Sequence, residues 1–205
     1  MSKTVSTVWL EHAALIVRQH ILDAGYQVQT CLETTRAMEY VLRAHGLRFE
    51  PQPVGAWACC PQWWADMSSG VPQDQCRGFS FGVGDPMPGE EPLPLVAAGR
   101  AWDGHLILRS PNADVLIDPS ADQLGSPERN MPVMGPFVAR PQNPIAWMTG
   151  QRAFFPNSTT GVVLAYRATS DQTWRGTPAW TGMPKRLRAV ADEALRRTWA
   201  IEAPK

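Results

Sequence analysis

TCLETTRAMEYVLRAHG, residues 30–46, has the apolar spacing of an amphipathic helix with a cysteine at its beginning. Thr30 and Glu33 have the T-x-x-E spacing of a capping box, in which the two side chains bind unpaired backbone N–H groups at the helix start. A glycine closes the stretch, as is typical of a helix C-terminus. The sequence therefore predicts a helix over residues 31–45, with Cys31 in its first turn.

The position of Cys31 allows two interpretations. A thiol attacks a carbonyl carbon as the thiolate, and the unpaired N–H groups and partial positive charge of a first helical turn favour the thiolate. On this interpretation Cys31 is a candidate nucleophile. On the other it is an inert small apolar residue on the buried face of a helix, the commonest role of an unpaired cysteine.

Two further candidate residues lie on a predicted β-hairpin. Apolar residues predict strands over 102–110 and 113–120, joined by a Pro-Asn turn at 111–112. His105 and Asp118 are nearly equidistant from the centre of that turn, so pairing would bring them opposite each other. A histidine can act as a general base while a carboxylate holds its ring in one tautomer. Taken singly, the histidine can be a strand residue with a local hydrogen bond, and the aspartate a turn former.

The other segments predict a mixed set of helices and strands. They lie over residues 4–24 (helix), 47–58 (strand), 160–169 (strand) and 183–201 (helix). Pro51 and Pro53 restrict the strand that contains them to a sheet edge or to an interrupted strand. The prediction is a single domain over residues 1–205, of the α+β class.

The segment from about residue 60 to 100 is dense in proline, glycine and polar residues. It predicts a long insertion over the surface, in which only FSFGV (79–83) can pair with another strand. Loops of this length in a compact domain are usually functional lids or partly disordered. Trp63, Trp64 and Trp102 lie in this segment or beside it and are candidate cleft residues, although tryptophan is also a large core residue.

The four cysteines predict free thiols rather than a disulfide framework, because two of them, Cys59 and Cys60, are adjacent. Zinc is the alternative, with Cys59, Cys60, Cys76 and a histidine as ligands. Adjacent cysteines lack the CxxC spacing that lets two sulfurs share one tetrahedral ion. The sequence therefore predicts no metal site.

Charge and hydropathy exclude several classes of partner. The 19 lysines and arginines balance the 19 aspartates and glutamates, so there is no overall electrostatic attraction to nucleic acid or to an anionic membrane. The sequence shows no secretory leader and no uncharged apolar run of about 18 residues. We expect a soluble cytoplasmic protein with no nucleic-acid or membrane partner. Nothing in the sequence specifies an oligomeric state.

The order helix-start cysteine, strand histidine, strand aspartate resembles the transglutaminase-like branch of the papain-like cysteine enzymes, which includes arylamine N-acetyltransferases. TCLETTRAMEYVLRAHGLRFEPQPV and DGHLILRSPNADVLIDPSADQ carry the resemblance, over about half of the chain. It implies a cysteine helix packed against an antiparallel β-sheet. It also implies Cys31 as nucleophile, His105 as general base and acid, and Asp118 as the residue that orients the imidazole. An oxyanion donor just upstream of the cysteine would be Gln27 or Gln29.

These residues give two hypotheses of function. The first is a thiol enzyme that forms an acyl-enzyme at Cys31 and passes the acyl group to water or an amine, with no cofactor. Hydrolysis, deamidation, transglutamination and acetyl transfer share that intermediate, and the resemblance favours protein or peptide amides as substrates. The second is a non-catalytic binding module of the same fold, which recognises a partner protein through its tryptophan- and proline-rich segment.

Overall fold

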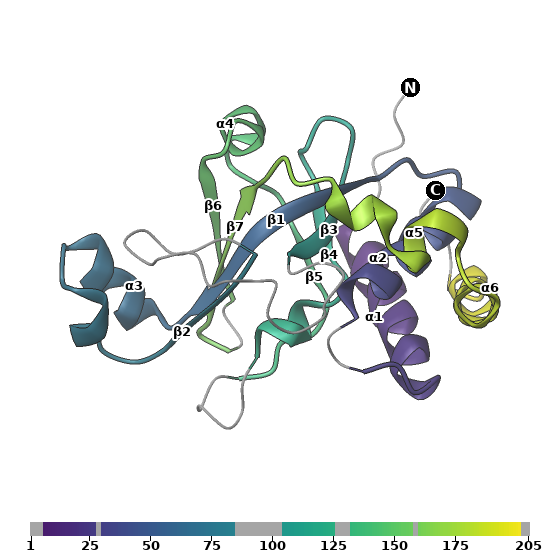
Figure 1. The fold of residues 1–205 in the computed structure, drawn as a ribbon, viewed down its shortest axis with the longest axis horizontal. Helices are drawn as coiled ribbons and strands as arrows, with labels where there is room; N and C mark the ends of the chain where they lie inside the picture. Colours follow the sequence, from purple (N-terminus) through teal and green to yellow (C-terminus); the bar gives the residue numbers. More distant parts are fainter. Residues whose placement is uncertain (1–5, 28–29, 85–103, 126–131, 158–159, 202–205) are drawn as a thin grey trace.

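The computed structural model describes residues 6–27, 30–84, 104–125, 132–157 and 160–201 (Figure 1). Its α-helices are α1 (Thr7–Asp23), α2 (Cys31–Ala44), α3 (Pro61–Ser68), α4 (Pro144–Met148), α5 (Pro178–Gly182) and α6 (Lys185–Trp199). Its strands are β1 (Glu50–Cys59), β2 (Ser80–Val83), β3 (His105–Arg109), β4 (Leu116–Asp118), β5 (Phe137–Ala139), β6 (Arg152–Pro156) and β7 (Val163–Ala168). The expected α+β class, with helices beside an antiparallel sheet, is confirmed.

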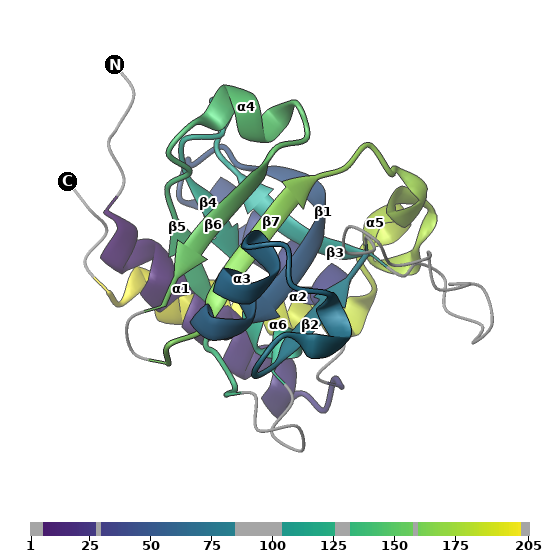
Figure 2. The same ribbon diagram turned by 90° about the vertical axis from the view of Figure 1, so that its left-hand side faces the viewer.

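The strands form one antiparallel, nearly barrel-shaped sheet in the order β5-β4-β3-β1-β7-β6, with β2 also paired to β1. Figures 1 and 2 show α1, α2 and α6 on one side of this sheet. Alternate residues of each strand point to opposite faces, so Leu108 packs with these helices whereas Ile107 packs inside the curved sheet. The sheet therefore separates two hydrophobic clusters, and the candidate site lies where β3 begins and β4 ends.

Strand β1, expected to be an edge or an interrupted strand, lies between β3 and β7 in the sheet. The two prolines, Pro51 and Pro53, pair with β3 on one side only. Pairing with β7 starts at Val54, after both prolines. Since proline has no N–H group to donate, it is tolerated in a strand where one side has no ladder to complete. The strand is central over its second half and an edge over its first.

The β3–β4 hairpin forms, but its turn is longer than expected. Leu108 pairs with Ile117, and the turn is closed by a 2.9 Å hydrogen bond from the Ser110 N–H group to the Val115 carbonyl. Ala113 takes a left-handed conformation with φ 55° inside this turn. The strands are consequently shifted by two residues from the expected register, which leaves every side chain on its expected face.

The segment from residue 60 onward also differs from the surface excursion that the sequence predicts. Pro61 starts helix α3, and the Cys60 sulfur accepts a hydrogen bond from the Trp63 N–H group. The predicted pairing of FSFGV is confirmed, since β2 pairs with β1. Helix α3, the 3-10 helix Gln73–Gln75 and strand β2 thus lie within the described part of this insertion, and residues 85–103 lie outside the described ranges.

The predicted helix over 31–45 is confirmed as α2, but its capping box is not. Thr30 occupies the N-cap position without a hydrogen bond from its side chain to the first turn. Its hydroxyl instead donates to the Gln27 carbonyl at 2.7 Å and accepts from Arg18 at 3.2 Å. Competition from a buried arginine therefore overrides the local capping signal. None of the helices in the described part of the chain is long and apolar enough to span a membrane.

Candidate active site

His105 and Asp118 form a buried pair at the open end of the β3–β4 hairpin. His105 is the first residue of β3 and Asp118 is the last of β4, and each is 1% exposed. The Nε2 atom of His105 lies 2.7 Å from Oδ2 of Asp118. In the observed register His105 lies diagonal to Asp118 on the same face, and diagonal neighbours are within reach of long side chains. The predicted proximity is confirmed, although the predicted register is wrong.

The Asp118 carboxylate has further hydrogen-bond donors. The Tyr166 hydroxyl donates to Oδ2 at 2.7 Å, and the Ser120 N–H group donates to Oδ1 at 3.0 Å. Burial raises the pKa of Asp118, but attraction to His105 and these hydrogen bonds outweigh burial and hold it below its ordinary value. Asp118 is therefore an ionised, fixed acceptor for the ring of His105.

The imidazole of His105 favours its protonated form. Burial lowers its pKa, but the charge of Asp118 and hydrogen bonds with Asp118 and Cys31 outweigh burial and raise it to about 10. Because Nε2 is bound to Asp118, Nδ1 is the ring nitrogen left for the thiol. The ring thus joins a carboxylate to a sulfur.

Cys31 begins α2 and lies beside the start of β3. Its sulfur is 3.9 Å from the Gly104 carbonyl oxygen, and the residue is 9% exposed. A hydrogen bond from the Thr35 hydroxyl to the Leu106 carbonyl, 2.8 Å long, fixes the first turns of α2 against β3. The structure therefore brings Cys31, His105 and Asp118 together at one end of the sheet.

The first turn of α2 has N–H groups without intrahelical partners. An α-helix leaves its first N–H groups without intrahelical partners, and the first helical bond here runs from Thr34 N–H to the Thr30 carbonyl. The Thr30 hydroxyl does not cap them. The turn that carries the thiol can therefore stabilise negative charge on sulfur or on a tetrahedral oxygen.

Strands β2 and β3 meet end to end beside this site, along the same edge of β1. Gly84 has φ +81°, and a Cβ atom there would lie 3.0 Å from the Cα atom of Gly104 and 3.2 Å from the His105 nitrogen. Any side chain at residue 84 would press on the backbone that positions His105. The two glycines permit this close approach.

Other tryptophans than the expected ones lie next to the thiol. Cys31 packs with Trp174 and Leu106, and Trp180 packs against the same cluster. The rings of Trp174 and Trp180 meet edge to face at 4.6 Å. An aromatic wall therefore borders Cys31, and it comes from the segment between β7 and α6.

The structure does not bring Trp63 and Trp64 to the thiol. Both lie on α3, which Figure 1 shows at the opposite end of the molecule from α2. Trp63 is 3% exposed in a cluster with Trp57, and the Trp64 ring packs on Phe154 at 4.3 Å. Their large apolar surface is used to attach α3 to the sheet, which is the core role of tryptophan.

The structure describes one of the two glutamines expected as oxyanion donors. Gln27 is exposed, and its backbone carbonyl accepts the Thr30 hydroxyl. Gln29 and Trp102 lie outside the described residues.

Cys59 is the last residue of β1 and Cys60 is the N-cap of α3, and their side chains contact different neighbours. The Cys59 sulfur lies 3.8 Å from the Val163 carbonyl oxygen and the Cys60 sulfur 3.7 Å from that of Arg77. Within the described ranges, no three histidine, cysteine, aspartate or glutamate side chains gather as metal ligands would. The geometry of this pair is that of two separate thiols.

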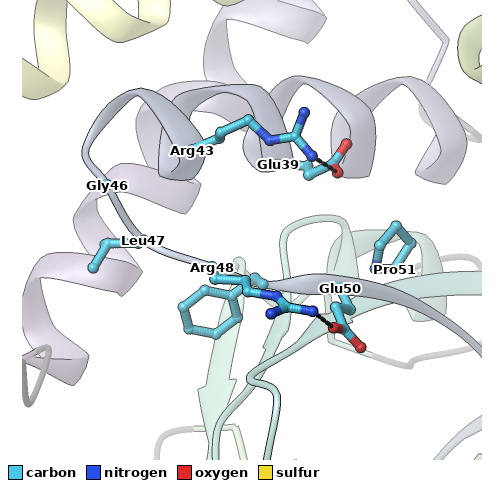
Figure 3. A pocket seen from close by; sticks show the side chains of 8 residues that line it. Glu39, Arg43, Gly46, Leu47, Arg48, Glu50 and Pro51 are labelled. Atoms are coloured by element: carbon cyan, nitrogen blue, oxygen red, sulfur yellow. Dashed lines mark hydrogen bonds and ion pairs between the residues drawn. The ribbon is translucent and has the colours of Figure 1, made fainter. Parts of the chain in front are cut away.

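A polar groove of about 450 Å³ lies at the other end of α2 (Figure 3). Arg43 extends toward Glu39 on the helix wall, and Arg48 toward Glu50 on the strand wall. The groove's lining residues on α2, Glu39 and Arg43, come eight and twelve residues after Cys31, so they lie about 12 to 18 Å from it along the helix axis at 1.5 Å per residue. The groove is separate from the site of Cys31.

No family model, curated protein or solved structure matches this chain. The function must therefore be argued from the site.

Proposed function

We propose that the protein is a thiol-dependent acyl-transfer enzyme with Cys31 as nucleophile, His105 as general acid and base, and Asp118 as the residue that orients the imidazole. The observation that carries the proposal is the buried His105–Asp118 hydrogen bond of 2.7 Å beside a thiol in a first helical turn. An antiparallel sheet beside the cysteine helix also supports assignment to the transglutaminase-like branch of the papain-like enzymes.

The charge arrangement suits a thiolate–imidazolium pair. The raised pKa of His105 keeps its ring protonated near neutral pH. A protonated ring and a helix N-terminus both place positive charge beside the Cys31 sulfur, and the thiolate is the nucleophilic form of a cysteine. The same ring can then donate its proton to a leaving group.

The reaction has two steps. In the first, the Cys31 sulfur forms a bond to the substrate's carbonyl carbon, the bond to the leaving amine breaks, and the amine takes the Nδ1 proton of His105. In the second, water or an amine attacks the thioester carbon and gives a proton to His105 while the carbon–sulfur bond breaks. Thiolate and imidazolium are regenerated, and no cofactor takes part.

Amide, ester and thioester carbonyls all fit this chemistry. The family resemblance favours protein or peptide amides, with hydrolysis, deamidation and transglutamination as alternative outcomes of one acyl-enzyme. The acceptor, water or amine, decides among them.

The binding module is less well supported. It depends on exposed aromatic residues in the segment from about residue 60 to 100, yet Trp63 is buried there. The labelling experiment below also distinguishes this alternative.

The experiment is competitive alkylation of the four cysteines with iodoacetamide at pH 7, followed by peptide mass spectrometry. Exposure alone would label the half-buried Cys60 and Cys76 faster than the buried Cys31. Burial raises the pKa of the Cys59 thiol to about 12, so Cys59 should be slow. We expect Cys31 to react fastest, and His105→Ala to slow it by about a hundredfold because the imidazolium partner is lost.

If the four cysteines are alkylated in the order of their exposure, the proposed enzymatic function is wrong. A Cys31 rate that His105→Ala leaves unchanged would contradict it too, and either result would favour the binding module. His20→Ala is the matched control, because His20 lies on α1 with its Nδ1 on the Ile16 carbonyl and should not affect Cys31.

A further inference from the structure

Arg18 connects the segment that begins at Cys31 to the segment that follows Asp118. It lies on α1 and is 3% exposed. Its Nε and Nη2 atoms donate to the Asp122 carboxylate at 2.9 and 2.6 Å. Its Nη1 atom donates to the hydroxyls of Thr30 and Thr34 at 3.2 and 3.0 Å. One guanidinium therefore binds the first turn of α2 and the loop after β4 together.

The backbone around Asp122 is hydrogen-bonded to Ser120, which in turn binds the Asp118 carboxylate. Asp122 belongs to the short 3-10 helix Ala121–Leu124, whose Gln123 N–H group donates to the Ser120 carbonyl at 3.0 Å. The Ser120 N–H group in turn donates to Oδ1 of Asp118. A displacement of Asp122 would thus pass through one turn of backbone to the carboxylate that binds His105.

The hydrogen bond from Arg18 to Thr30 affects the surroundings of the Cys31 thiol. Thr30 is the residue before Cys31 and occupies the N-cap position, where a threonine hydroxyl ordinarily binds a first-turn N–H group. Arg18 and the Gln27 carbonyl hold that hydroxyl instead. The arginine therefore keeps the N-cap side chain from occupying the N–H groups next to the sulfur.

We propose that Arg18 is a positioning residue, which holds the first turn of α2 in place relative to the Asp118 carboxylate and so sets the distance between Cys31 and His105. This inference rests on the proposed function. Arg18 lies on α1, outside the three segments that carry the site residues, and its hydrogen bonds to Thr30, Thr34 and Asp122 reach neighbours of Cys31 and Asp118. A misplacement of about 1 Å by a remote residue can cost about a hundredfold in rate.

The test measures the rate constant for alkylation of Cys31 by iodoacetamide from pH 5 to 10 in Arg18→Met. Methionine keeps much of the packing volume and removes every hydrogen bond of the guanidinium. We expect the rate at pH 7 to fall at least tenfold and the midpoint of the pH profile to rise, because the thiolate loses its fixed partner. Asp122→Asn should change both quantities in the same direction, and Arg18→Lys should retain part of the rate.

A matched control separates positioning from stability. Val17→Ala removes buried volume from the adjacent position of the same helix, where Val17 is 0% exposed and contacts the core. It should lower the melting temperature but leave the midpoint of the pH profile unchanged. Circular dichroism on each variant identifies the folded ones, and Asp122→Asn replaces Arg18→Met if the latter does not fold.

The outcomes distinguish this proposal from the proposed function. If Cys31 of the unchanged protein is no more reactive than Cys60, the proposed function fails, and the role of Arg18 with it. If Cys31 is reactive and depends on His105, but folded Arg18→Met or Asp122→Asn keeps its rate and midpoint, only the role of Arg18 fails. An equal shift of the midpoint in Val17→Ala would also overturn it.

Discussion

The two ends of helix α2 differ in how far their charged side chains are buried. At the N-terminal end Cys31 lies beside the His105–Asp118 pair, whose side chains are each 1% exposed. At the C-terminal end Arg43 pairs with Glu39, and the arginine side chain is 77% exposed. Both ends hold opposite charges at hydrogen-bonding distance. In the buried pair, burial by itself lowers the pKa of His105, but the charge of Asp118 raises it to about 10, because water no longer screens the attraction.

The strand wall of the polar groove at the C-terminal end of α2 also carries exposed ion pairs. Arg48 is 78% exposed and lies 2.9 Å from Glu50, which also pairs with Arg109 at 2.7 Å. Exposed pairs of this kind contribute about 0 to 1 kcal/mol, since solvation and side-chain entropy oppose the attraction. Similar opposite charges therefore form a buried, tightly held pair at one end of α2 and a solvated surface at the other.

The largest expected effect comes from Asp118→Asn. Removing one partner of a buried charge pair costs about 3 to 5 kcal/mol, because the other charge is left without compensation. We expect that loss in the free energy of unfolding, measured by urea denaturation at pH 6, together with slower alkylation of Cys31. Glu50→Gln at the exposed end should change the stability by less than about 1 kcal/mol. Equal losses from the two variants would contradict the comparison.

The pH dependence of this loss sharpens the prediction. Because the pKa of His105 is raised from 6.5 to about 10, its contribution is full below pH 6.5 and is lost as the pH rises through 10. Because the pKa of Asp118 is lowered from 3.8, its contribution is full above pH 3.8 and is lost as the pH falls further. The difference in the free energy of unfolding between the unchanged protein and Asp118→Asn should therefore be largest between pH 3.8 and pH 6.5 and should shrink toward pH 10. A difference that grows with alkaline pH would show that His105 is neutral.

A smaller effect is expected from Tyr166→Phe, which removes the 2.7 Å hydrogen bond to the Asp118 carboxylate. Buried hydrogen bonds to charged groups contribute about 2 kcal/mol. Tyr40→Phe is the matched control, since the Tyr40 hydroxyl donates to Asp192 at the same 2.7 Å in a partly exposed setting. Thermal unfolding of both variants should show the greater loss for Tyr166→Phe. The reverse order would mean that Asp118 is held by its other donors alone.

The smallest effect is expected from Arg48→Gln in the groove. We expect a change of less than about 1 kcal/mol in the free energy of unfolding and no change in Cys31 alkylation. Raising the salt concentration should remove even this effect, because exposed charges are screened. A larger loss would indicate that the groove's ion pairs act as a network.

The local patterns predicted much of the site. The helix that begins at Cys31 and the hairpin that carries His105 and Asp118 follow from apolar spacing and turn residues, which act over a few positions. The expected register was wrong by two residues because Ala113 adopts a left-handed conformation that the sequence does not signal. The proximity of His105 and Asp118 survived because an even shift keeps each side chain on its face.

The residues from distant segments that contact Asp118 and Cys31 were not predictable from local patterns. In the sequence Tyr166 is one more large residue of a predicted strand. A tyrosine hydroxyl needs a hydrogen-bond acceptor once it is buried, but the sequence does not say which residue supplies it. The tryptophans next to Cys31 are Trp174 and Trp180, rather than those of the insertion, because the chain returns to α2 after β7. Such contacts depend on the order of strands in the sheet.

The sequence by itself determined the helix that begins at Cys31 and the hairpin that carries His105 and Asp118, since helix periodicity, turn residues and a first-turn thiol are properties of neighbouring positions. Only the tertiary structure decided that Asp118 is ionised and held by Tyr166, and that Thr30 binds Arg18 instead of capping its helix. Burial and charge pairing bring together groups far apart in the chain, and their balance exists only once the chain has folded.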